Sequence, residues 1–138
     1  MPKIIYAIDD EPAITRILKI NLERIGYQVE TCNDSHEALE TLQSGTIKPD
    51  LIFSDVTMPY MDGFEFLNRV KADPNLEHIP FVMITARSRD ADILEGRSRG
   101  VAGYITKPVV LEELFSTVKI ILEEHEKTAE ETEQTETA

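Results

Sequence analysis

The sequence predicts an α/β fold in which helices cover both faces of a five-stranded parallel sheet, a doubly wound arrangement. Five short apolar runs alternate with five stretches of helical periodicity, as in consecutive strand–helix units. Several of these runs are apolar throughout, which is typical of strands that are covered on both faces. A barrel would need eight such units, and 138 residues suffice for one ordinary domain.

The predicted strands are short, and only the second has polar residues in its interior. The first, Ile4–Ile8, is a continuous apolar run. The second, at 27–31, alternates apolar and polar residues, so we expect it at an edge of the sheet. The third is the apolar run 51–53, and two further runs at 80–84 and 103–106 complete the sheet.

Start and stop signals bound the predicted helices. Pro12 suits a first helical turn, and Asp34 with Glu37 resembles a capping box. Gly26 and Gly45 suit the position just after a helix. The expected helices cover residues 12–25, 34–44, 63–71, 89–99 and about 110–124.

Composition and charge exclude several functional classes. The net charge is −12, and an acidic protein gains little from a nucleic-acid backbone. The single cysteine, Cys32, allows no internal disulfide and no cysteine-rich metal site. No apolar stretch approaches the roughly 20 residues of a membrane span, and acids follow the first apolar run too soon for a signal peptide. We therefore expect a cytoplasmic protein that binds neither nucleic acid nor membrane.

The C-terminal segment differs in composition from the rest of the chain. Residues 123–138 contain seven acids and one lysine and so carry −6 of the net charge. Their Glu- and Thr-rich sequence shows no apolar periodicity, which is typical of disorder. We expect a folded domain over residues 1–125 and a disordered acidic tail over 126–138.

Polar residues follow four of the strands at the points where these end. Asp9 and Asp10 follow the first, Asp55 the third, Thr85 the fourth and Lys107 the fifth. The carboxyl ends of parallel strands meet at one edge of a sheet, where ligands bind in such folds. Clustered carboxylates repel one another, and a hard divalent cation such as Mg²⁺ or Mn²⁺ relieves this repulsion.

This combination of groups suits phosphoryl chemistry. A metal ion, an ammonium group and a hydroxyl around one carboxylate match the oxygens of a phosphoryl group, because phosphoryl transfer depends on positioning and charge neutralisation. A carboxylate can itself be the nucleophile and form an aspartyl phosphate. The residues therefore indicate a metal-assisted phosphoryl site with Asp55 as the acceptor.

Four segments surround these strand ends. They are Ile8-Asp9-Asp10-Glu11-Pro12, Asp55-Val56-Thr57-Met58-Pro59-Tyr60-Met61-Asp62-Gly63, Thr85-Ala86 and Tyr104-Ile105-Thr106-Lys107-Pro108. Together they resemble the receiver domain of two-component response regulators. Each segment alone is weak evidence, but their combination, in this order and at one predicted edge of the sheet, is specific. The resemblance covers about residues 3–124 and implies the strand order 2-1-3-4-5 of the flavodoxin-like receiver fold.

The resemblance implies a role for each metal-site residue. Asp55 resembles the aspartate that is phosphorylated and that also binds the metal ion. Asp10 resembles the direct Mg²⁺ ligand, and Asp9 supports it. The main-chain carbonyl of Thr57, two residues after the acceptor, corresponds to a further ligand of the family.

The resemblance also implies a switch. Thr85 resembles the hydroxyl that bonds the phosphoryl group, and Lys107 the lysine that pairs with it, with a cis bond to Pro108. Tyr104 resembles the aromatic residue that turns inward as Thr85 moves. Phosphorylation would then bias two pre-existing packings of a surface formed by residues 89–99, the fifth strand and the fifth helix.

The implied function is that of a stand-alone, single-domain response regulator. It would accept phosphate from a histidine kinase or phosphotransfer protein and act on a downstream protein by contact, with a homodimer through the switch surface as a further option. It would promote its own phosphorylation and dephosphorylation without being a dedicated enzyme. The alternative is a constitutive interaction module with the same fold that acts without phosphorylation.

Two enzymatic alternatives fit the sequence less well. A haloacid-dehalogenase-type phosphatase needs a second acid two residues after its nucleophile, where this chain has Thr57. A nucleotide-binding enzyme needs a glycine-rich loop after the first strand, which Asp9-Asp10-Glu11-Pro12 is not.

Arginines near the predicted fourth helix offer a second surface. Arg87 and Thr57 occupy positions flanking the site that tune dephosphorylation in the family. A basic patch is either a solvated face or a docking surface for an acidic partner or the chain's own tail. Its members are Arg87, Arg89, Arg97 and Arg99.

Overall fold

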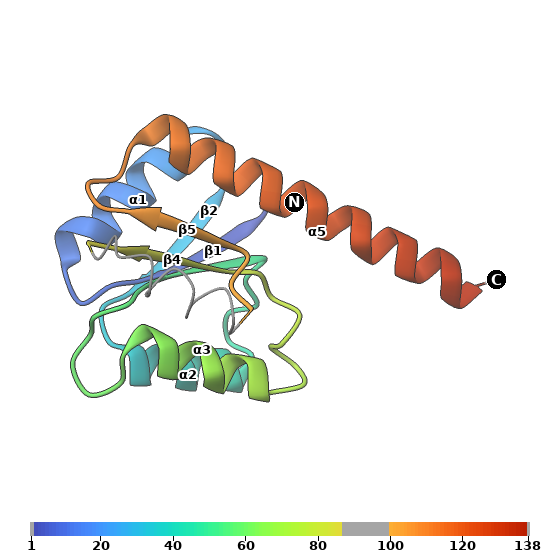
Figure 1. Cartoon of the computed structure of the whole chain (residues 1–138), viewed down its shortest axis with the longest axis horizontal. Coiled ribbons are helices and arrows are strands. Elements are labelled where there is room, and N and C mark those ends of the chain that lie inside the picture. Colours follow the sequence, from blue (N-terminus) through green and yellow to red (C-terminus); the bar gives the residue numbers. More distant parts are fainter. Residues whose placement is uncertain (1, 87–99, 138) are drawn as a thin grey trace.

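The computed structural model describes residues 2–86 and 100–137, with side chains described up to residue 128. It confirms a single five-stranded parallel sheet in the order β2-β1-β3-β4-β5 (Figure 1). The strands are β1 (Ile4–Ile8), β2 (Gln28–Cys32), β3 (Leu51–Asp55), β4 (Phe81–Thr85) and β5 (Gly103–Thr106). Each predicted strand is therefore present, with ends that shift by at most two residues.

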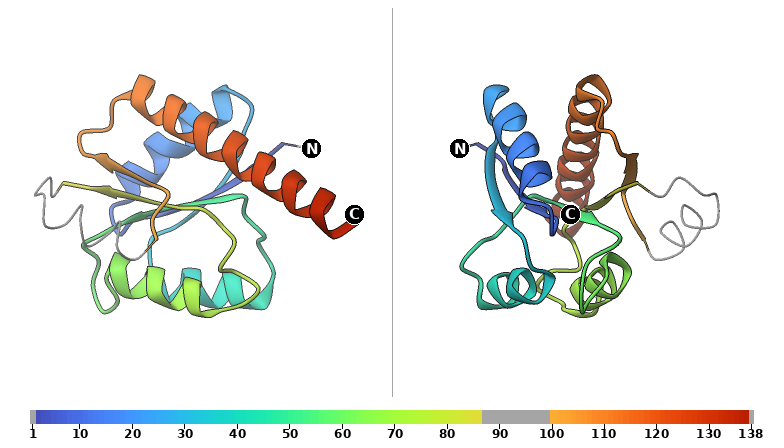
Figure 2. Two further views of the ribbon diagram at one scale, coloured as in Figure 1. Left: turned by 45° about the vertical axis from the view of Figure 1, so that its right-hand side comes forward. Right: turned by 90° about the vertical axis from the view of Figure 1, so that its left-hand side faces the viewer.

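Helices cover both faces of the sheet, as predicted. Figure 1 and Figure 2 show α1 and α5 on one face and α2 and α3 on the other. The described helices are α1 (Pro12–Arg24), α2 (Ser35–Ser44), α3 (Gly63–Ala72) and α5 (Leu111–Thr137). The predicted fourth helix at 89–99, and with it the arginine patch, lies outside the described residues.

Each face of the sheet has its own apolar core, which explains why the central strands are apolar up to their polar carboxyl ends. On one face, Leu18 and Leu22 of α1 pack with Leu114 and Val118 of α5 against the strands. On the other face, α2 and α3 pack against the sheet through residues that include Phe66. β3 is buried along its whole length, so its last residue, Asp55, is held in place by core packing on both sides.

The predicted capping signals act where the sequence places them. The carboxylate of Asp34 accepts a hydrogen bond from the backbone N–H of Glu37 at the start of α2. Gly45 ends this helix in the left-handed conformation, with φ of 75°. Asp62 caps α3 in the same way by accepting from the N–H of Glu65.

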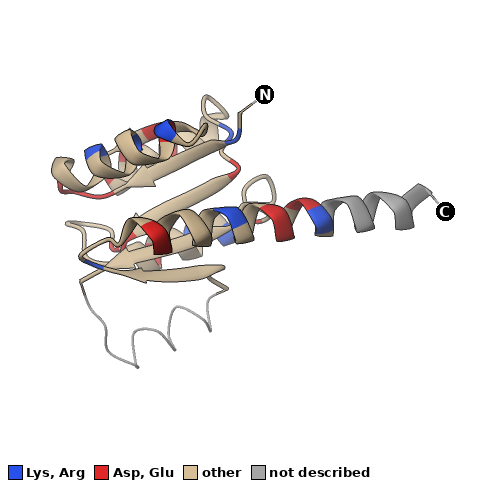
Figure 3. Ribbon diagram, turned by 90° about the horizontal axis from the view of Figure 1, so that it is seen from above, with Lys and Arg blue, Asp and Glu red and all other residues tan. Residues whose placement is uncertain are grey.

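Helix α5 is longer than the sequence predicted. We expected it to end near residue 124, but it continues to Thr137 and projects from the body (Figure 1). Acidic and basic residues both occur along the part of α5 that is coloured in Figure 3. Residues 126–138 contain no glycine or proline, and Glu, Lys, Gln and Ala have high helix propensity, so nothing in the sequence stops the helix. Treating residues 126–138 as a unit separate from the domain stays a prediction.

Two contacts hold α5 where it leaves the body. Lys3 Nζ lies 3.0 Å from Oε1 of Glu126, and the rings of His78 and His125 stack with centroids 6.3 Å apart.

Among the helices described, none has the length and apolar character needed to cross a bilayer.

Candidate functional site

The parallel sheet brings the polar strand ends together. β3 pairs with β1 and β4, with Ile8 beside Ser54 and Asp55 beside Ile84. β5 pairs with β4 so that Thr85 lies beside Thr106, and Lys107 follows directly. These ends surround a pocket of about 320 Å³, which is lined by Asp10, Glu11, Asp55, Thr57, Thr85, Ala86 and Lys107.

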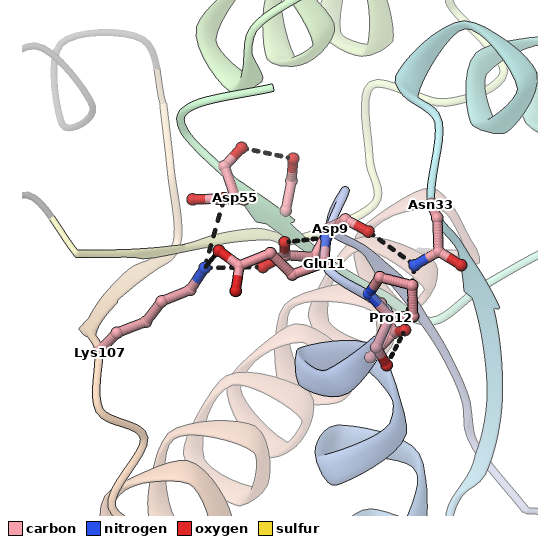
Figure 4. Close-up of polar contacts among 8 residues, drawn as sticks. Asp9, Glu11, Pro12, Asn33, Asp55 and Lys107 are labelled. Carbon is pink, nitrogen blue, oxygen red and sulfur yellow. Dashed lines mark hydrogen bonds and ion pairs between the residues drawn. The ribbon is translucent and has the colours of Figure 1, made fainter. Parts of the chain in front are cut away.

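Lys107 is the centre of the charge network (Figure 4). Its Nζ lies 2.9 Å from Oδ2 of Asp9 and 3.3 Å from Oδ2 of Asp55. The more exposed carboxylate of Glu11 lies further away, at 3.9 Å. The side chain of Lys107 is only 13% exposed, so one ammonium group is held against two buried carboxylates. The bond from Lys107 to Pro108 is cis, as predicted.

Four carboxylates lie close together at this edge of the sheet. Single oxygens of Asp9, Asp10, Glu11 and Asp55 all lie within 4.8 Å of one another. Asp9 and Asp55 are buried, whereas Asp10 and Glu11 are exposed to solvent. One ammonium group cannot neutralise four carboxylates, and closely spaced carboxylate oxygens are the donors that Mg²⁺ and Mn²⁺ prefer. The donor set therefore fits a hard divalent cation.

Burial dominates the electrostatics of the two inner acids. It raises the pKa of both Asp9 and Asp55 above the ordinary value of 3.8, although Lys107 and backbone N–H donors oppose this rise. For Lys107, burial lowers the pKa, but hydrogen bonds and ion pairs with the two aspartates outweigh it, so the pKa is raised overall. Because burial removes water from the two carboxylates and so disfavours their charged forms, additional positive charge nearby would stabilise them.

The backbone that follows Asp55 wraps tightly around it. The backbone of Val56 and Thr57 opposes the rise in the pKa of its carboxylate, and the N–H of Gly63 donates a hydrogen bond to the carbonyl of Val56 at 2.8 Å. A side chain at Gly63 would overlap the carbonyl of Asp55 and approach the Cα of Val56 within 2.9 Å. Gly63 therefore lets the start of α3 pack directly on the backbone of Asp55.

The predicted switch residues lie on neighbouring strands. Thr85 is buried at the end of β4 and also lines the pocket. Tyr104, on β5, is partly buried and packs against the core on the α2–α3 side of the sheet. Thr57 is exposed beside the pocket, and Arg87 lies outside the described residues. The roles of these residues stay predictions.

Sequence reasoning missed the individual roles of three residues. Glu11 joins the acidic cluster, although the sequence indicates it only as a member of the segment that follows the first strand. Gly63 makes the close backbone approach, although the sequence indicates it only as the start of the third helix. Asn33 donates a hydrogen bond to the carbonyl of Asp9, and a polar residue just after β2 was the sole signal for it.

Comparison with known proteins places the whole arrangement in one family. The response regulator receiver domain matches residues 5–119. The chain is 38% identical over 133 residues to the alkaline phosphatase synthesis transcriptional regulatory protein PhoP of Bacillus subtilis, covering 96% of this chain and 54% of that protein. It is 40% identical over 110 residues to the two-component response regulator ARR10 of Arabidopsis thaliana, covering 80% of this chain and 19% of that protein.

Solved structures give the same result. The chemotaxis protein CheY4 of Vibrio cholerae superposes with a TM-score of 0.80 and 32% identity, over 88% of this chain and 99% of that one. A CheY-like response regulator receiver domain protein from Methanospirillum hungatei gives a TM-score of 0.82 and 29% identity, over 93% of this chain and 99% of that one.

The chain spans about half the length of the first of these curated relatives and about a fifth of the second, so their full activities do not transfer to it. The receiver fold, the acidic cluster at the ends of its strands and these matches agree over most of the chain. The chain belongs to the receiver domain family of two-component response regulators.

Proposed function

We propose that this chain accepts a phosphoryl group on Asp55 from a histidine kinase or a phosphotransfer protein. The observation that carries the proposal is the position of Lys107, whose ammonium group lies between the carboxylates of Asp9 and Asp55. A buried carboxylate with raised pKa, beside a lysine and at the edge of a pocket, is a strong candidate for a nucleophile.

The transfer step uses the residues around the pocket. A carboxylate oxygen of Asp55 attacks the phosphorus of a phosphohistidine or of acetyl phosphate. The bond from phosphorus to the donor breaks, the donor leaves with its electron pair, and an acyl phosphate forms on Asp55. Lys107 neutralises charge on the phosphoryl oxygens, and the hydroxyl of Thr85 donates a hydrogen bond to one of them.

The acidic cluster would hold a divalent cation in this step. Asp9, Asp10, Asp55 and the main-chain carbonyl of Thr57 are the proposed ligands. Mg²⁺ or Mn²⁺ bound there supplies positive charge to the phosphoryl oxygens and screens the carboxylates from one another. Asp10 is exposed and so is accessible to an incoming hydrated ion, whereas Asp9, in the same cluster, is buried.

The consequence of phosphorylation would be a shift between two packings of the output surface. Movement of Thr85, at the end of β4, toward the phosphoryl group would be accompanied by an inward turn of Tyr104 on the neighbouring strand β5. The proposed output surface comprises residues 89–99, β5 and α5, and it would act on a downstream protein or on a second copy of the chain. In this role the chain is a phosphoacceptor in the cytoplasm and not a dedicated enzyme.

Intact-protein mass spectrometry tests the proposal. Wild-type protein incubated with acetyl phosphate and Mg²⁺ should gain the mass of one phosphoryl group, and chelation of the metal should prevent the gain. Asp55→Asn should abolish it. Asp50→Asn is the matched control, because Asp50 lies just before the same strand, at its opposite end. An unmodified wild type with every donor would leave the constitutive interaction module as the better account.

A further inference from the structure

The side chain of Asn33 makes one hydrogen bond to the acidic loop after β1 and one to the first turn of α1 (Figure 4). Its Nδ2 donates a hydrogen bond of 2.7 Å to the main-chain carbonyl of Asp9. The same amide donates to Oγ1 of Thr15, at 3.2 Å. The hydroxyl of Thr15 in turn donates to the carbonyl of Pro12, at 3.1 Å. These bonds connect the loop after β2 to the end of β1 and to the first turn of α1.

The bond to the carbonyl of Asp9 controls the position of Asp10. That carbonyl belongs to the peptide unit that joins the two residues, and a peptide unit is planar. Fixing the direction of its oxygen therefore fixes the direction from which the chain enters Asp10. Asp10 itself is exposed, and packing alone does not hold it in place.

The fold does not otherwise explain this side chain. Asn33 is exposed, so it buries little surface, and the N-cap of α2 is the next residue, Asp34. The backbone already joins the two loops, because the N–H of Asp9 donates to the carbonyl of Cys32. The side chain adds a direct restraint on the acidic loop, and hydrogen bonds to the groups behind metal ligands orient those ligands.

We propose that Asn33 is a positioning residue for the divalent-cation site and acts on the ion through Asp9 and Asp10. This inference rests on the proposed function, because it assumes that the acidic cluster binds the ion. Loss of the amide would free the peptide unit to rotate, and the ligands would have to be ordered when the ion binds. The site would then bind Mg²⁺ more weakly with its ligands unchanged.

Calorimetric titration of the unphosphorylated protein with Mg²⁺ provides the direct test. Asn33→Ala should weaken the affinity by about 10- to 100-fold, the range found when groups behind metal ligands are removed. Asn21→Ala is the matched control, because Asn21 on α1 also donates its amide to a backbone carbonyl, that of Ile17. This control should bind Mg²⁺ as the wild type does.

A second variant separates positioning from charge. Asn33→Asp keeps the shape of the side chain but removes the donor and adds a negative charge near the cluster. If Asn33 acted only through local charge, this variant would bind Mg²⁺ more tightly. Positioning predicts weaker binding instead. Phosphorylation by acetyl phosphate adds a further readout: Asn33→Ala should need more Mg²⁺ for half the maximal rate and reach the wild-type rate at saturation.

These titrations test the positioning role of Asn33 separately from the proposed phosphorylation of Asp55. Equal Mg²⁺ affinity in wild type and Asn33→Ala, or tighter binding by Asn33→Asp, would overturn the positioning role. Wild-type protein that binds no Mg²⁺ would overturn both proposals. Wild-type protein that binds Mg²⁺ but accepts no phosphoryl group would overturn the proposed function, while the comparison of Mg²⁺ affinities would still decide the role of Asn33.

Discussion

The ammonium group of Lys107 lies 3.3 Å from Oδ2 of Asp55, although 52 positions separate the two residues in the chain. β3 and β5 are not neighbours in the sheet, since β4 lies between them. The lysine reaches across from the residue after β5, and its nitrogen also contacts Asp9 at the end of β1. Three strand ends are thus tied by one side chain.

Removing the ammonium group should destabilise the metal-free protein. In Lys107→Met two buried carboxylates lose their positive partner, and an unpaired buried polar group costs about 1–3 kcal/mol. The free energy of unfolding from urea titration should fall by this amount, and Mg²⁺ should restore part of it. Lys119→Met serves as the control, because Lys119 is exposed on α5. Equal stability of Lys107→Met and wild type would mean that the ion pairs contribute nothing to folding.

Replacing Asp55 with a neutral side chain should stabilise the metal-free protein at neutral pH. The pKa of Asp55 is raised by burial, so the folded state holds this proton to a higher pH than the unfolded state does. This group therefore costs stability as pH rises from its ordinary pKa of 3.8 through the folded pKa. Asp55→Asn should then be more stable than wild type at pH 7 without metal.

The difference in stability between Asp55→Asn and wild type should depend on pH. Thermal unfolding in metal-free buffer should show the advantage of Asp55→Asn at pH 7 and its disappearance below the ordinary carboxyl pKa, where Asp55 is protonated in both states. An advantage that persists unchanged into acid would attribute the effect to packing and not to charge.

Gly63→Ala should displace the backbone of Asp55. Alanine normally favours a helix, but the added Cβ would overlap the backbone of Asp55 and Val56. Overpacking of this kind costs about 1–3 kcal/mol, so the midpoint of urea unfolding should fall. The rate of phosphorylation by acetyl phosphate should fall as well, because Asp55 is displaced. Ala72→Gly, at the other end of α3, is a control in which stability falls without loss of that rate.

Tyr60 is held in a strained turn and should tolerate glycine. Its φ is 69°, its side chain is 93% exposed, and the N–H of Met61 donates to the carbonyl of Pro59 around it. A non-glycine residue in this conformation costs about 1–2 kcal/mol. Tyr60→Gly should therefore match or exceed wild-type stability in urea unfolding. Gly45→Ala, which places a side chain at φ of 75°, should lose stability. A clear loss in Tyr60→Gly would show that the aromatic ring packs in solution.

Much of the fold could be predicted because local signals and global packing agree. The continuous apolar run at Ile4–Ile8 and the capping residues Asp34 and Gly45 each specify one local outcome, and the structure matches them. The end of α5 could not be predicted in this way. Its final residues lack an apolar face, but they also lack a stop signal, and helix propensity decides their conformation.

The site was predictable to the extent that strand ends converge in a parallel sheet. Asp9, Asp55 and Lys107 could be placed together because each follows an apolar run. Contacts made by backbone atoms are harder to foresee. Neither the overlap at Gly63 nor the bond from Asn33 to the carbonyl of Asp9 leaves a pattern in the sequence, because both depend on how two loops approach in space.

Chemical mapping of the phosphorylated residue tests the central claim most directly. Borohydride reduces an aspartyl phosphate to homoserine, releasing phosphate, and peptide mass spectrometry then locates the changed residue. After incubation with acetyl phosphate and Mg²⁺, we expect homoserine at position 55 and unmodified aspartate at positions 9, 10 and 62. Homoserine at another aspartate, with Asp55 intact, would contradict the assignment of Asp55 as the phosphoryl acceptor.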